Sequence, residues 1–131
     1  MASNALSLLG LALRGGNLAV GEEPAAEACR ARRARLVVSA ADAAQNSIDR
    51  GRRMAELGGV PWVRLPWDKE ALGAALGRKL CAVAALTDRG LAAAFAEKLV
   101  QTDEGLRPSL DSLLNEKKKP RAKQRPAELE I

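Results

Sequence analysis

The 131-residue chain contains no histidine and no tyrosine, and aromatic side chains make up only 2% of it. Without histidine, a Ser-His-Asp triad, a histidine metal site and a histidine acid–base catalyst are all excluded. Only two cysteines are present, too few for a structural zinc site built from cysteine alone or for a disulfide framework. We therefore expect two buried free thiols, and neither a metal ion nor a cofactor.

The sequence also lacks a long apolar run and the common signatures of small α/β enzymes. No run reaches the roughly 18 residues typical of a membrane span, and residues 1–16 carry no basic leader region. The glycines fit neither P-loop nor dinucleotide spacing. Asp42 and Asp88 stand at helix starts, where N-capping explains them better than catalysis. We expect a non-enzymatic, cytoplasmic protein that has no membrane or small-molecule substrate among its partners.

Positive charge is concentrated at the end of the chain. The net charge is +5, and residues 115–131 hold six basic and three acidic residues, which leaves 15 basic and 13 acidic on residues 1–114. A basic balance favours an anionic partner such as nucleic acid, but an anion site on the folded part must come from local clustering. We expect a folded domain over residues 1–104, and over residues 105–131 a short helix (108–114) with a basic, disordered tail.

Apolar periodicity predicts helices that alternate with short strands. The expected helices cover residues 4–14, 22–32, 43–57, 69–76 and 88–100, and the expected strands cover residues 18–20, 35–40, 60–65 and 81–86. Asp42 should cap the third helix, with Gln45 completing a capping box. This alternation predicts a sheet covered on both faces. The predicted fold class is α/β, a three-layer α/β/α sandwich with about four strands.

A glycine turn is the first candidate binding feature. Gly21 precedes a helix that begins with Glu22 and Glu23. The first amides of a helix are unpaired and suit hydrogen-bonding or anionic ligands, while carboxylates can accept from base amino groups or a 2′-hydroxyl. An ordinary capped helix start is the alternative interpretation.

Basic clusters are the second and third candidate features. Four arginines fall within six residues, at Arg30, Arg32, Arg33 and Arg35. They can contact a phosphate backbone, although a solvated surface explains them equally well. The loop that follows Gly77 places Arg78 and Lys79 beside Leu80, a combination suited to supporting an unstacked base. That loop can equally be a simple helix stop.

The order of segments resembles a known family. Over about residues 4–100 the chain contains, in this order, LLGLALRGGNLAVGEE, ARLVVSAADAAQNS, VPWVRL, DKEALGAALGRK and VAALTDRGLA. This order resembles the kink-turn RNA-binding ribosomal protein family of the archaeal and eukaryotic large subunit, and above all its bacterial YlxQ-type branch. The resemblance implies an α/β/α sandwich with a small mixed sheet. It also implies a ribosome-associated protein that binds sharply kinked RNA.

The family contacts RNA with the glycine-led start of its second helix and with the loop before its last strand. Together with two residues of the arginine cluster, the matching positions give the predicted RNA-binding set Gly21, Glu22, Glu23, Arg30, Arg33, Lys69, Arg78, Lys79 and Leu80. Two positions depart from the family pattern. Pro24 stands where RNA-binding members carry glutamate, and Glu27 replaces a lysine. The departures leave an alternative open, a protein–protein interaction module that keeps the fold without specific RNA recognition.

Overall fold

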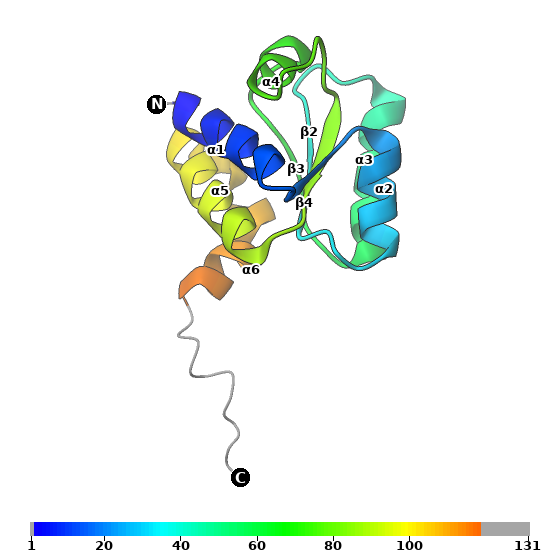
Figure 1. Cartoon of the computed structure of the whole chain (residues 1–131). Coiled ribbons are helices and arrows are strands. Elements are labelled where there is room, and N and C mark those ends of the chain that lie inside the picture. Colours follow the sequence, from blue (N-terminus) through cyan, green and yellow to red (C-terminus); the bar gives the residue numbers. More distant parts are fainter. Residues whose placement is uncertain (1, 119–131) are drawn as a thin grey trace.

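A four-stranded sheet forms the middle layer of the computed structural model, which describes residues 2–118 (Figure 1). The strands are β1 (Leu18–Val20), β2 (Leu36–Ser39), β3 (Trp62–Arg64) and β4 (Val83–Leu86). The helices are α1 (Ala2–Arg14), α2 (Glu22–Arg30), α3 (Gln45–Gly58), α4 (Lys69–Ala75), α5 (Arg89–Thr102), the 3₁₀ turn η1 (Glu104–Leu106) and α6 (Arg107–Lys118). No helix among these residues is long and apolar enough to cross a membrane.

The sheet is mixed, with the strand order β1-β4-β2-β3. β2 pairs with β3 in parallel, whereas β4 runs antiparallel to both β1 and β2. The register places Val20 opposite Ala84, and Ser39 opposite both Arg64 and Val83. The C-terminal ends of β1, β2 and β3 therefore lie beside the start of β4. We call this end of the sheet the upper edge, and the opposite end the lower edge.

Helices cover both faces of the sheet. α1, α5 and α6 form one layer, and α2 and α3 form the other (Figure 1). Because both faces are covered, every residue of β2 and β4 is buried. The larger core cluster includes Leu9 and Phe95 under the first layer, and a smaller cluster of mainly small residues lies under α2 and α3. The α/β/α sandwich predicted from the sequence is confirmed, with four strands in a mixed sheet.

The predicted capping box at the start of α3 is wrong. The N-cap of this helix is Ala44, and no side chain caps it. The Asp42 carboxylate instead accepts a hydrogen bond from the backbone amide of Lys69 at 2.8 Å. Gln45 donates to Asp49 Oδ1 at 2.9 Å, one turn along its own helix. Asp42 thus ties the β2–α3 loop to the first residue of α4, which lies 27 residues away in the chain.

Two local predictions are confirmed. The Asp88 carboxylate caps α5 by accepting from the amide of Leu91 at 2.9 Å. Cys29 and Cys81 are free and buried. Burial raises the pKa of both thiols, which keeps them in the neutral, unreactive form.

The chain continues past α5 into η1 and α6. α6 is longer than the helix expected over residues 108–114. Its side chains Leu110, Leu113 and Leu114 are buried in the larger core cluster, so α6 packs into the same layer as α1 and α5. The disorder expected after residue 114 is wrong for residues 115–118, which belong to α6, and residues 119–131 lie outside the described residues.

Gly73 in α4 allows the α4–β4 loop to pack against that helix. A Cβ atom at this position would lie 2.8 Å from both Cα and N of Leu80, and 2.9 Å from the carbonyl oxygen of Arg78. Two backbone hydrogen bonds hold the loop: the Arg78 amide donates to Gly73 O at 2.8 Å, and the Cys81 amide donates to Lys69 O at 3.0 Å. The position of the loop at the upper edge therefore requires glycine at residue 73.

We expect the substitution Gly73→Ala to lower the free energy of unfolding by about 1–3 kcal/mol, because the added methyl group overpacks against backbone atoms. Gly90→Ala is the matched control in a helix, since the nearest atom to its Cβ is Asp88 Oδ2 at 3.4 Å. We expect that control to be neutral or slightly stabilising. Urea denaturation followed by circular dichroism measures both. Wild-type stability for Gly73→Ala would contradict the packing described for the loop.

Candidate nucleic-acid interface

The upper edge brings together loops that are far apart in the sequence. The Gly21 amide donates to the carbonyl oxygen of Val83, at the start of β4, at 2.9 Å. Lys69 lies at the same edge, because its carbonyl accepts from Cys81 at the end of the α4–β4 loop. In α/β folds the C-terminal ends of parallel strands are the usual place for ligands. The Gly21 turn, the start of α4 and the α4–β4 loop therefore form a single candidate surface.

The Gly21 turn exposes the start of α2. Gly21 has φ 102° and ψ 164°, a conformation that residues with a Cβ rarely adopt, and no side chain caps the helix. The first helical hydrogen bond runs from the Ala25 amide to Gly21 O at 3.0 Å. Pro24 has no amide hydrogen. The amides of Glu22 and Glu23 are therefore the two donors of this first turn left for a ligand.

The two glutamates differ in their surroundings. Glu22 Oε2 accepts from Arg50 Nε of α3 at 2.6 Å, and both side chains are partly exposed. Glu23 is exposed and forms no hydrogen bond or ion pair within the described part of the chain. Of the two carboxylates, only that of Glu23 is free to accept a hydrogen bond from a ligand without breaking an existing contact.

The α4–β4 loop presents cations and an apolar side chain to solvent. Gly77 ends α4 with φ 72°, and Arg78, Lys79 and Leu80 are all exposed. The exposed fraction of Leu80 is 53%, so this leucine side chain is accessible to a ligand. The loop therefore offers an exposed apolar side chain and two positive charges at one place on the upper edge.

The arginine cluster lies away from this surface. α2 runs from the upper edge to the lower edge, a rise of about 13 Å for a nine-residue helix. Arg30 is its last residue and faces Glu27 at 3.7 Å, and the Arg35 amide donates to Leu86 O at the lower edge. Arg33 lies between them. The structure therefore does not bring Arg30 and Arg33 of the predicted RNA-binding set to the surface formed by the Gly21 turn and the α4–β4 loop, because the length of α2 separates them.

Arg32 ends α2 in a backbone conformation that normally favours glycine. Its φ is 62°, the only positive φ of a non-glycine residue within residues 2–118. The amides of Arg32 and Arg33 donate to Cys29 O and Ala28 O, the two hydrogen bonds of a Schellman motif. The Arg32 guanidinium reaches α3 and donates to Gly58 O at 3.4 Å. The left-handed conformation costs an L-residue about 1–2 kcal/mol, and here it places a cation between two helix ends.

We expect Arg32→Gly to raise the free energy of unfolding by about 0.5–1 kcal/mol, because glycine adopts this conformation without strain. Arg33→Gly is the neighbouring control. Arg33 has no positive φ, so glycine there adds only chain entropy and should lower stability by about 0.5–1 kcal/mol. Thermal denaturation of both variants measures the difference. If both substitutions changed the free energy of unfolding in the same direction, the backbone strain assigned to Arg32 would be contradicted.

Residues 3–95 match the Ribosomal protein L7Ae/L30e/S12e/Gadd45 family. The chain belongs to this family. The match extends from α1 into α5, so the family fold includes all four strands and every loop of the upper edge. A search of curated proteins gave no match.

Two solved structures are similar to this member of the family. A protein of unknown function from Bacillus halodurans is 28% identical with a TM-score of 0.65, and the similarity covers 71% of this chain and 93% of that one. A 15.5 kDa RNA-binding protein from Giardia lamblia is 28% identical with a TM-score of 0.59, covering 77% of this chain and 85% of that one. Family membership and the Giardia protein together support RNA binding.

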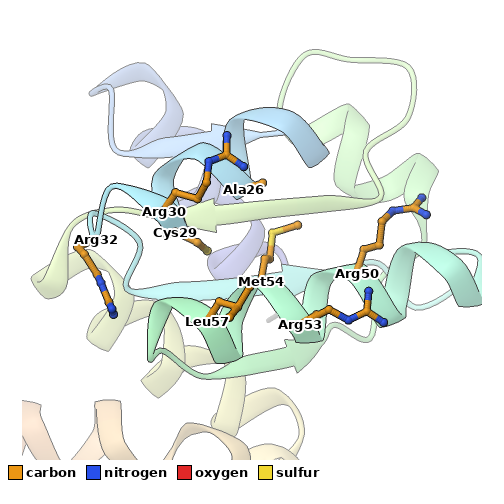
Figure 2. Close-up of a pocket in the computed structure, with 8 residues that line it drawn as sticks. All are labelled: Ala26, Cys29, Arg30, Arg32, Arg50, Arg53, Met54 and Leu57. Carbon is orange, nitrogen blue, oxygen red and sulfur yellow. The ribbon is translucent and has the colours of Figure 1, made fainter.

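A second surface, which the sequence did not predict, is an open groove between α2 and α3 (Figure 2). It has a volume of about 620 Å³ and is lined by four arginines, Arg30, Arg32, Arg50 and Arg53. Arg50 and Arg53 were not among the predicted site residues. The one available signal was Leu57, which falls outside the buried stripe of α3 formed by Ile48, Met54 and Ala55.

Proposed function

We propose that this protein is a cytoplasmic, non-enzymatic RNA-binding protein that recognises structured, kink-turn-like RNA and associates with the ribosome. One observation carries the proposal: the hydrogen bond from Gly21 to Val83 brings the two loops that family members use for RNA to one edge of the sheet. The family and the RNA-binding protein from Giardia support the ligand class.

Each part of the upper edge has a distinct role in this proposal. Lys69, Arg78 and Lys79 neutralise and position the phosphate backbone. The free amides at the start of α2 donate to base acceptors or to a 2′-hydroxyl, and the Glu23 carboxylate accepts from a base amino group. Leu80 packs against an unstacked base. Sequence information is thus read mainly by backbone groups and by one loop.

Pro24 and Glu27 set the limits of this recognition. Pro24 removes one donor from the first turn of α2. Glu27 lies one turn later and carries a negative charge that is only partly offset by Arg30 at 3.7 Å, since both side chains are exposed. Phosphate is disfavoured along the outer side of α2, so Arg30 and Arg33 lie outside the proposed RNA surface.

We expect the double substitution Arg78→Ala/Lys79→Ala to weaken binding to a kink-turn hairpin by about tenfold or more, and to reduce the slope of log affinity against log salt by about 2. The matched control is Arg14→Ala/Lys98→Ala, which removes two cations from the α1 and α5 layer. Fluorescence anisotropy at several salt concentrations measures all three proteins. Unchanged affinity of the loop variant would remove the α4–β4 loop from the RNA surface.

An unkinked hairpin of the same length tests the specificity. Preference for the kinked hairpin supports the proposal. Equal, weak and steeply salt-dependent binding to both hairpins would instead show that the protein binds RNA only by nonspecific electrostatic attraction. That result would favour the protein–protein interaction module. Repeating the titration with residues 1–118 measures the share contributed by the basic tail.

A further inference from the structure

The groove between α2 and α3 differs in chemistry from the upper edge. Its floor is apolar and includes the buried side chains of Cys29 and Met54, and the exposed Leu57 and the arginine side chains lie around them (Figure 2). The exposed fraction of Leu57 is 75%, higher than that of any other large hydrophobic side chain in the described part of the chain. Leu57 extends the apolar floor of the groove, and contiguous exposed apolar surface is typical of interaction sites.

The arginines around the groove carry unbalanced positive charge. Two of them are paired with carboxylates of α2. The other two, Arg32 and Arg53, form no ion pair within residues 2–118. Arg32 is held at one end of the groove by its left-handed backbone and by its hydrogen bond to Gly58 O. The groove therefore combines an apolar floor with two available cations at its rim.

The two helices that form the groove are in contact near both of its ends. A Cβ atom on Gly58 would lie 3.2 Å from the Cβ of Cys29, so α2 and α3 nearly touch at this end. At the other end the ion pair between Glu22 and Arg50 joins them. The two helices start at the same edge of the sheet and run in parallel. A groove between two helices is a common docking site for a third.

The lining of the groove does not suit RNA. Proteins that bind single strands stack bases on aromatic side chains, and none lines this groove. Trp62 lies instead beneath Arg52 at 5.4 Å and donates to Ser39 Oγ at 3.0 Å, while Phe95 is fully buried. Binding to a duplex backbone depends on charge and gains little from an apolar floor.

We propose that this groove binds an acidic amphipathic helix of a protein partner. Apolar side chains on one face of that helix contact Met54 and Leu57, and flanking carboxylates pair with Arg32 and Arg53. The groove lies along the side of α2 and α3, whereas the RNA surface lies at the upper edge. The inference therefore goes beyond RNA binding, and it stands whether or not the upper edge binds RNA.

The probe is a synthetic, fluorescein-labelled helical peptide with leucine on one face and glutamate on the other, titrated with the full-length protein. We expect saturable binding that Leu57→Ala and Arg53→Glu each weaken by about tenfold or more. Leu11→Ala and Arg14→Glu, on exposed positions of α1, are the matched controls and should leave the affinity unchanged. All four substitutions are on the surface, and circular dichroism confirms that each variant is folded.

Two comparisons separate this proposal from bulk electrostatics and from RNA binding. A peptide of the same charge with alanine in place of leucine should bind at least about tenfold more weakly. The Arg78→Ala/Lys79→Ala variant should bind the leucine peptide with unchanged affinity. Equal binding of the two peptides, absence of saturable binding, or displacement of the leucine peptide by the kink-turn hairpin would each overturn the proposal.

Discussion

The insertion of β4 between β1 and β2 is the constraint on which the rest of the molecule depends. β4 is the last strand in the sequence, and it pairs antiparallel with strands that precede it by more than forty residues. This pairing brings the loop before β4 to the Gly21 turn, and the bond from Gly21 to Val83 extends it by one residue. The upper edge therefore exists only once the whole sheet has formed, because each of its parts comes from a different segment.

The small side chains of the second layer bring its helices close to the sheet and to each other. α2 faces the sheet with Ala25, Ala28 and Cys29, so that helix and strand backbones approach closely. At such distances a single added methyl group is felt, as the contact between Gly58 and Cys29 illustrates. The scarcity of aromatic residues thus allows the helices of this layer to pack closely.

Local signals in the sequence were sufficient for the layers but not for the sites. The alternation of helices and strands gave the sandwich, and Asp88 could be placed because a cap and its amide are three residues apart. Asp42 has the same local pattern, yet its partner is Lys69 on another element. Arg33 likewise lies far from Gly21 because α2 runs from the upper edge of the sheet to the lower edge. This direction follows from the strand pairing, which local sequence signals do not reveal. The groove could not be predicted from the sequence because its walls belong to two helices, α2 and α3. Which sides of these helices face each other depends on the tertiary structure.

Both outer strands of the sheet, β1 and β3, are only three residues long. An unpaired edge of this length offers few free backbone groups to a strand from another molecule. Copies of the protein therefore gain little by joining their sheets side by side into a continuous sheet. Neither outer strand offers the long exposed edge through which apolar strands of different molecules associate.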